Sequence, residues 1–301
     1  MRFFLLVLLL PFVSFSQNID FDGYVLDAKT NEPIPYVNIS FLNTLKGTSS
    51  DEKGHYFLEI QKEFLEKDVH VSSLGYKDVV IKASDLFNTK LILLDAATFE
   101  LEEVVVMDNL SNSQVLNPIG SNKITGGFNS SSTPWILALY FPNMDSSKKY
   151  VEKVTIFFRN NTGQTLSSSK FRLRLFNVDY THKTPNDDLV QKSLILDVKK
   201  NQEYVSIDLS RLRIKVPKEG IYNGLEWLFI PSNWYKKINK NEVTQKEIWE
   251  DRFAPTFGGI YTKNRDYRFM VYGMGEWNDF TINSFSNQEK FIPAISLKIS
   301  K

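Results

Sequence analysis

Short segments that alternate apolar and polar residues run through most of this chain, and turn-forming residues separate them. In YVNISF, Val37, Ile39 and Phe41 point to one side of an extended backbone, whereas Asn38 and Ser40 point to the other. The stretch FRLRLF in the middle of the chain alternates in the same way, with its arginines outward. Period-two alternation in runs this short predicts strands buried on one face. Strands broken this often by turns favour an all-β sandwich.

The predicted strands form two groups with a polar stretch between them. The first group lies at residues 21–28, 36–42, 55–60, 68–73, 77–82, 90–94 and 101–107. The second lies at residues 135–141, 151–159, 171–178, 189–198, 204–209, 222–231, 267–274 and 291–299. Residues 108–134 are rich in Gly, Ser and Asn and predict a linker. We therefore expect a seven-stranded antiparallel sandwich over residues 17–107 and a larger, jelly-roll-like sandwich over residues 135–301. The second contains one short helix, at residues 242–251.

The N-terminus has the three-part pattern of a secretory signal peptide. MRFFLLVLLLPFVSFSQ places one positive charge at Arg2 before an apolar run, and small residues follow at Ser14 and Ser16. We expect removal of residues 1–16 and a mature chain that begins at Gln17. No later stretch reaches the roughly 18 apolar residues of a membrane helix. The mature chain is therefore expected in the periplasm, at the outer membrane or outside the cell, without a transmembrane segment.

The charge balance and the cysteine content exclude some kinds of binding partner and some kinds of metal site. The chain has 36 Lys+Arg against 35 Asp+Glu, so its positive and negative charges nearly balance and no nucleic-acid partner is expected. It has no Cys, which excludes disulfides and thiolate metal sites.

Three turn-rich blocks in the first group carry a family resemblance. GYVLDAKTNEPIPYVNIS contains Pro33 and Pro35, GTSSDEKGHYFLEI contains Asp51 and Gly54, and LGY centres on Gly75. In this order the blocks resemble the carboxypeptidase-regulatory-like domain of Bacteroidota envelope proteins. The resemblance implies a transthyretin-like (prealbumin-like) sandwich.

The name of that domain does not imply a peptidase. The associated zinc carboxypeptidases need a His-x-x-Glu motif. None of the three histidines of this chain begins one, because the residues three positions later are Leu58, Ser73 and Pro185. We expect no catalytic residue, no metal ligand and no cofactor here.

The end of the first group resembles a docking motif. Such domains precede the TonB box of outer-membrane transporters, and a similar segment follows here: Leu101, Glu102, Glu103, Val104, Val105 and Val106. The barrel of such a transporter has 22 strands and needs roughly 220 residues in its strands alone. This is more than the sequence has after residue 107, so a transporter is not expected. Two readings stay open. The segment is the closing strand of the sandwich, or it is an exposed strand that docks on an envelope partner such as a TonB-type protein or a transporter component.

Large aromatic residues gather late in the chain: Trp227, Trp234, Tyr235, Trp249, Tyr261, Tyr272 and Trp277. In sugar-binding jelly rolls such residues stack on pyranose rings, whereas in most sandwiches they belong to the core. Trp234 and Tyr235, in the polar stretch PSNWYKK, are the pair expected to be exposed. With Trp277, they are the candidate ligand-binding residues.

Acidic residues of the second group suggest further chemistry. Asp179, Asp187 and Asp188 surround His182 in one predicted loop and could bind Ca²⁺, but their spacing fits no EF-hand and solvated loop acids are the commoner explanation. Glu226 could serve as a catalytic acid, although no partner carboxylate can be assigned. VPKEGIYNGLEWLFIP also resembles passages in uncharacterised Bacteroidota envelope proteins, which implies no activity.

These observations predict an exported, non-enzymatic cell-envelope protein that makes protein or glycan contacts through β-sandwich surfaces. The alternative is a carbohydrate-active or other hydrolytic enzyme with its site in the C-terminal domain. A cleft with two facing carboxylates would favour the enzyme, and a flat face with Trp234 and Tyr235 would favour binding.

Overall fold

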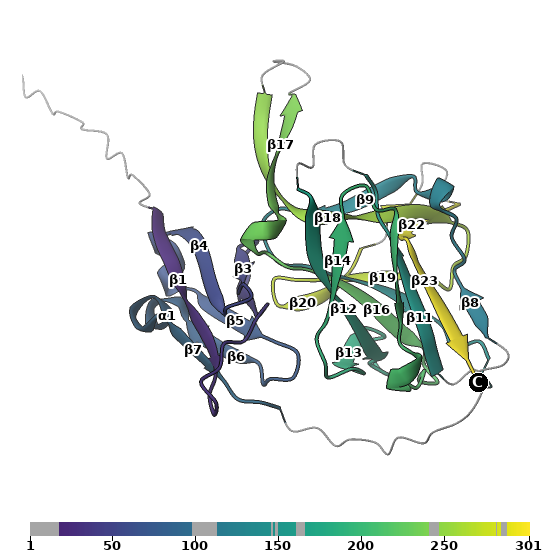
Figure 1. The fold of residues 1–301 in the computed structure, drawn as a ribbon, viewed down its shortest axis with the longest axis horizontal. Helices are drawn as coiled ribbons and strands as arrows, with labels where there is room; N and C mark the ends of the chain where they lie inside the picture. Colours follow the sequence, from purple (N-terminus) through teal and green to yellow (C-terminus); the bar gives the residue numbers. More distant parts are fainter. Residues whose placement is uncertain are drawn as a thin grey trace, which may run out of the picture.

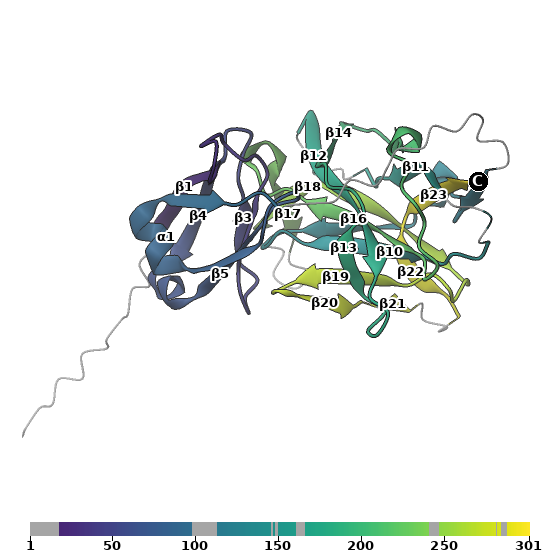
Figure 2. The same ribbon diagram turned by 90° about the horizontal axis from the view of Figure 1, so that it is seen from below.

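The computed structural model describes residues 18–97, 113–145, 147, 150–160, 166–240, 247–280, 282–283 and 288–301. These residues form two β-rich units, one before and one after residue 112, which lie side by side in both views (Figures 1 and 2). The predicted all-β class is confirmed. The expected signal peptide and the segment at residues 101–107 lie outside the described residues.

The first unit packs two sheets face to face. Its strands are β1 (Asn18–Asp27), β2 (Asn38–Phe41), β3 (Gly47–Ser49), β4 (His55–Gln61), β5 (Asp68–Ser72), β6 (Val79–Lys82) and β7 (Leu91–Leu94). One sheet has the order β4–β1–β7 and the other the order β3–β2–β5–β6. Alternate side chains from both sheets fill the core, among them the fully buried Phe21, Val25, Ile39 and Phe41.

Two features of the first unit differ from the prediction. A helix, α1 (Ala83–Thr89), connects β6 to β7 and ends at Lys90, which adopts the left-handed conformation. This connection brings β7 beside β1 in parallel, whereas the alternation had predicted an antiparallel sandwich. Strand β3 was not predicted, because the three residues GTS are too few to show a period.

The second unit is a larger sandwich. Its described strands are β8 (Gln114–Leu116), β9 (Gly126–Ser130), β10 (Ile136–Phe141), β11 (Tyr150–Phe157), β12 (Ser168–Val178), β13 (Pro185–Asp188), β14 (Leu194–Lys199), β15 (Tyr204–Asp208), β16 (Ile221–Trp227), β17 (Trp234–Lys240), β18 (Glu247–Thr262), β19 (Phe269–Gly273), β20 (Glu276–Asp279), β21 (Ile282–Asn283), β22 (Lys290–Pro293) and β23 (Ile295–Ser300). One layer is the sheet β13–β12–β16–β10–β19–β20, in which β14 also pairs with β12.

Two further sheets form the facing layer. They have the orders β15–β11–β23–β8 and β17–β18–β22–β21, with β9 also paired to β18. A bridge between Phe158 and Phe257 joins them, and β22 leads directly into β23. The chain crosses repeatedly between the layers, as in a jelly roll, and Phe171, Leu173 and Leu175 point into the core as predicted.

Several predicted boundaries in the second unit need correction. The helix expected at residues 242–251 is wrong where the chain is described, because residues 247–251 begin β18 and pair with β17 in a hairpin that projects from the unit (Figure 1). Part of the stretch expected as a linker supplies β8 and β9, which pair with β23 and β18. The strand expected at residues 189–198 begins only at Leu194, and that expected at 291–299 is split at Ala294 into β22 and β23.

The two units are in direct contact. Tyr36 of the first unit packs against Leu228 and Ile230 of the second. The backbone N–H of Phe229 donates to Ser49 Oγ (3.0 Å), and the Phe229 carbonyl accepts from the Ser49 N–H (3.4 Å). None of the helices in the described part of the chain is long and apolar enough to cross a membrane.

Candidate functional site

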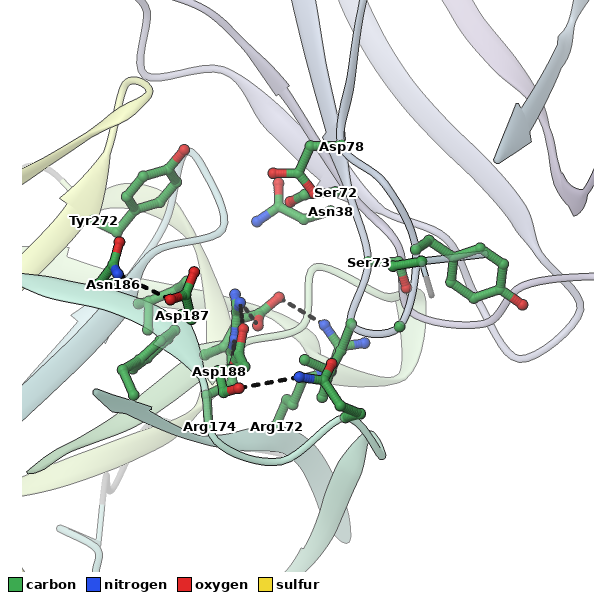
Figure 3. Close-up of a pocket in the computed structure, with 18 of the residues that line it drawn as sticks. Asn38, Ser72, Ser73, Asp78, Arg172, Arg174, Asn186, Asp187, Asp188 and Tyr272 are labelled. Carbon is green, nitrogen blue, oxygen red and sulfur yellow. Dashed lines mark hydrogen bonds and ion pairs between the residues drawn. The ribbon is translucent and has the colours of Figure 1, made fainter. Parts of the chain in front are cut away.

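A cleft of about 410 Å³ lies between the two units, and we call it the polar cleft (Figure 3). Its first-unit wall includes Asn38, Ser72, Ser73 and Asp78. Its second-unit wall includes Arg172, Arg174, Phe176, Asn186, Asp187, Asp188, Glu226, Tyr272 and Trp277. Side chains that are far apart in the sequence therefore meet in one cavity.

Strand geometry explains why these side chains meet. Arg172 and Arg174 alternate with core residues along β12, so both point away from the core of the second unit, as the sequence predicted. Glu226 lies directly opposite Arg172 on β16 and shares its face. On the other wall, Asn38 on β2 lies opposite Ser72 on β5. The outward face of each sheet is therefore turned toward the other unit.

Arg172 and Glu226 form a buried ion pair behind the polar cleft. Arg172 Nη1 lies 2.9 Å from Glu226 Oε1, and the two side chains are 2% and 1% exposed. Arg172 also donates from Nε to Ser193 Oγ (2.9 Å) and from Nη2 to the Tyr36 carbonyl (2.6 Å). A buried guanidinium is tolerated only with such partners. Because Tyr36 belongs to the first unit, this arginine also connects the two units.

Arg174 holds the second ion pair of the cleft. Its Nε donates to Asp188 Oδ1 (3.0 Å), its Nη2 contacts Asp188 Oδ2, and its Nη1 lies 3.5 Å from Glu226 Oε2. Burial and the nearby Glu226 raise the pKa of Asp188, although Arg174 opposes the shift. Burial by itself would lower the pKa of Arg174, but Asp188 and Glu226 raise it. Both oxygens of Asp188 are therefore committed to the ion pair.

An aromatic wall forms another side of the polar cleft. Trp277 lies edge-on to Phe176, with ring centroids 5.5 Å apart, and is tilted against Tyr272 at 5.3 Å. Tyr272 and Trp277 are register partners on β19 and β20, so they share one face of the sheet. The Arg174 guanidinium lies 4.7 Å from the centre of the Phe176 ring and supports this wall from behind.

Asp78 and Asp187 offer hydrogen-bond acceptors from opposite walls (Figure 3). Asp78 Oδ2 lies 3.1 Å from His70 Nε2, and Asp187 Oδ2 accepts from Asn186 Nδ2 (3.0 Å). The Oδ1 atoms of both aspartates have no hydrogen-bond partner among the described residues. A polar ligand in the cleft can donate to these oxygens.

The three candidate ligand-binding residues separate in the structure. Trp277 lines the polar cleft, and Trp234 is 42% exposed in a different cleft. The expectation that Tyr235 is exposed is wrong, since only 2% of this residue is exposed. Trp234 and Tyr235 are successive residues of β17, so their side chains point to opposite faces and only one reaches solvent. No flat face presents both.

The sequence did not identify most of the polar cleft. Asn38, Ser72 and Asp78 meet Asn186 and Asp187 only because the two units pack together. Alternation indicated that Asn38 points outward, but no spacing pattern indicated what it faces.

The candidate calcium ligands are divided between two places. Asp179 accepts from the His182 backbone N–H (2.5 Å) and lies 3.1 Å from His182 Nδ1, so it stabilises its own turn. Asp187 and Asp188 point instead into the polar cleft. Among the residues with described positions, no group of three or more His, Asp or Glu side chains is arranged to hold a metal ion. Glu226, the candidate acid, is committed to Arg172.

The family comparison concerns the first unit alone. Residues 21–106 match the CarboxypepD_reg-like domain family, so this part of the chain is a carboxypeptidase-regulatory-like domain, as the turn blocks indicated. No curated protein matches the chain.

Among solved structures, the chain is similar to the crystal structure of the cysteine protease and lectin-like domains of Cwp84, a surface layer associated protein of Clostridium difficile. The identity is 11% and the TM-score 0.36, with 94% of this chain and 58% of that chain covered. The chain thus spans little more than half of that structure. This likeness is too low to assign a function.

Proposed function

We propose that this chain is an exported, non-enzymatic protein of the cell envelope that binds a glycan in the polar cleft. The observation that carries the proposal is the aromatic wall of Trp277 and Tyr272 beside carboxylate and amide groups in one cleft of about 410 Å³. Sugar rings have C–H faces that pack on aromatic rings, and their hydroxyl groups donate to carboxylates. A cavity of this size, with a few fixed polar groups, suits a small ligand or the end of a glycan.

The ion pairs of the cleft favour binding over hydrolysis. A glycosidase needs two carboxyl groups that are free to transfer a proton and to attack or activate water. Glu226 is buried and paired with Arg172, and Arg174 holds both oxygens of Asp188, so neither carboxyl group is available for this role. Asp78 and Asp187 lie on opposite walls, and neither is held by an arginine among the described residues (Figure 3). Hydrolysis therefore has to be measured together with binding.

The test is a glycan array followed by titration calorimetry on the chain from residue 17 to 301. Trp277→Ala is expected to weaken binding at least about tenfold, and Asp187→Asn to weaken it about threefold, because each removes one class of contact. Trp249→Ala is the matched control, since Trp249 is 58% exposed on the projecting hairpin and does not line the cleft. Equal losses for the two tryptophan variants would contradict the proposal, and turnover of a bound glycan would favour the enzyme.

The export proposal rests on the N-terminal pattern alone. Mass spectrometry of the native protein should find a mature N-terminus at Gln17 in the envelope or the extracellular fraction. An intact Met1 in the cytosol would contradict it.

The role of residues 101–106 is also a proposal, since these residues lie outside the described part of the chain. The matching family model extends to residue 106, which supports the closing strand rather than a docking strand for a TonB-type protein. We expect Val104→Asp and Val106→Asp to lower the free energy of unfolding by about 2 kcal/mol or more, because a buried unpaired charge is costly. Unchanged melting with loss of an envelope partner would favour docking.

A further inference from the structure

A second cleft, of about 860 Å³, lies between the edge of the first unit and the base of the β17–β18 hairpin, and we call it the apolar groove. Three of the side chains that line it are large and open to solvent: Leu45 (49% exposed), Phe57 (52%) and Trp234 (42%). Trp234 Nε1 donates to Asp251 Oδ1 (3.0 Å), which fixes the ring at the rim. Exposed apolar side chains gathered in one groove indicate a contact surface.

One wall of the apolar groove is the edge of β4 that faces away from β1. Among the described residues, β4 is the terminal strand of its sheet and pairs only with β1. The Phe57 carbonyl accepts a hydrogen bond from Thr48 Oγ1 (3.0 Å). The His55 N–H donates to Asp51 Oδ1, and the His55 carbonyl accepts from the Asp51 N–H. His55 and Phe57 therefore direct their backbone groups away from β1, and Glu59, two residues further on, does the same. The Glu59 N–H and carbonyl have no hydrogen-bond partner among the described residues.

An extended peptide fits both features of the groove. Its backbone can pair with Glu59 and the Phe57 N–H, and its alternate side chains can pack on Leu45, Phe57 and Trp234. The groove also carries three carboxylates, Asp51, Glu59 and Asp251, against one ammonium, Lys46. This charge favours a basic partner over an acidic one such as residues 101–106 of the chain itself, which include two glutamates.

We propose that the apolar groove docks an extended segment of a partner protein, with alternating apolar side chains and flanking Lys or Arg, which adds a strand to the free edge of β4. This inference is independent of glycan binding, because it uses a different cleft. It assigns Trp234 to peptide contact and Trp277 to the polar cleft.

The test uses the chain from residue 17 to 301 and three fluorescein-labelled peptides. We expect KVTVTVK to bind in a fluorescence anisotropy titration, and EVTVTVE and LEEVVV to bind at least about tenfold more weakly. N-methylation of one alternate set of peptide amides should weaken KVTVTVK at least about tenfold, and methylation of the other set should have little effect, because only one set faces β4. Failure of KVTVTVK to bind, equal binding of LEEVVV, or indifference to both methylations would overturn the proposal.

Variants of the chain provide a second readout. Glu59→Pro removes the outward N–H without a loss from the β1 ladder, whereas Glu59→Ala keeps that N–H. We expect Glu59→Pro to weaken peptide binding at least about fivefold more than Glu59→Ala does, with glycan binding unchanged. Trp234→Ala should also weaken peptide binding, and Trp249→Ala should not. Equal effects of Glu59→Pro and Glu59→Ala in folded proteins would show that the strand edge is not used. If Glu59→Pro does not fold, the methylated peptides decide the question.

Discussion

The polar cleft and the apolar groove both lie between the two units, but they are built from different parts of a β-sheet. The polar cleft uses outward side chains of paired strands, and buried ion pairs such as Arg172–Glu226 fix its wall. The apolar groove uses a strand edge that pairs with no other strand in the described part of the chain, and solvent-exposed side chains such as Phe57 and Trp234. The first arrangement suits a ligand whose polar groups are met at fixed positions. The second suits an extended backbone and tolerates variation in the side chains of the peptide.

The difference also predicts how each cleft responds to mutation. A wall that depends on buried charges cannot lose one partner without cost to the fold, because the other charge is left uncompensated. A wall of exposed side chains can lose one with a small change in stability and a large change in binding. Measurements of stability and of binding on the same variants therefore test this difference between the two clefts.

The largest effect is expected at Arg172. Arg172→Met should lower the free energy of unfolding by about 3–5 kcal/mol, because the buried Glu226 loses its partner at 2.9 Å and keeps, among the described residues, only the Arg174 contact at 3.5 Å, and because the bond to the Tyr36 carbonyl is lost. Urea denaturation followed by circular dichroism measures the change.

The double variant Arg172→Met/Glu226→Leu is the control for this prediction. It removes both charges, so it should recover at least about half of the stability lost in the single variant. A double variant as unstable as Arg172→Met alone would show that packing, not charge, dominates this wall.

The neighbours Tyr235 and Trp234 give the next largest contrast. Tyr235→Ala should lower the free energy of unfolding by about 3 kcal/mol, because Tyr235 is 2% exposed and its loss leaves a cavity. Trp234→Ala should cost about 1 kcal/mol, because its ring is partly solvated at the rim of the apolar groove. Thermal and urea unfolding of both variants test the contrast. Equal losses in the free energy of unfolding would mean that Trp234 is part of the core.

These two residues also show how far sequence reasoning reaches. Alternation correctly located most strands and the inward side chains of β12. A strand with one buried face requires apolar residues at every second position, and this period is visible in the sequence. The polarity of the stretch PSNWYKK suggested that both aromatics are exposed, but successive residues of a strand face opposite ways. The register of β17 against β18, which decides which ring is buried, depends on contacts distant in sequence.

The polar cleft was harder to predict for a related reason. The outward direction of Arg172 and Arg174 was predicted, and the usual meaning of an outward arginine is contact with water. Here the first unit covers that face, and Tyr36 of the first unit accepts from Arg172. A covering domain leaves no periodic signal in the strand that it covers. Single-sequence patterns therefore define the faces of each sandwich but not the surface that results when the two sandwiches meet.

The smallest effect tests the layer directly behind the polar cleft. Tyr222 packs there with Ile136 and Phe176, and its hydroxyl donates to the Lys183 carbonyl (2.6 Å). Burial raises the pKa of Tyr222 to about 12, against about 10 for an unfolded chain. The protonated side chain thus contributes stability that is fully present below pH 10 and is lost as the pH rises through about 12.

Comparison with Tyr222→Phe isolates this contribution. At pH 7 the variant should be about 1 kcal/mol less stable than the wild type, because it lacks the hydrogen bond to Lys183. Between pH 10 and 12 the difference in the free energy of unfolding should shrink. Only the wild type has a hydroxyl at this position, and that hydroxyl ionises more easily in the unfolded chain than in the folded one. The other tyrosines are common to both proteins and cancel in the difference. Urea unfolding at pH 7 and pH 11 measures it. A difference that stays constant or grows with pH would show that the Tyr222 hydroxyl reaches solvent, and that the layer behind the polar cleft is as open as the rim of the apolar groove.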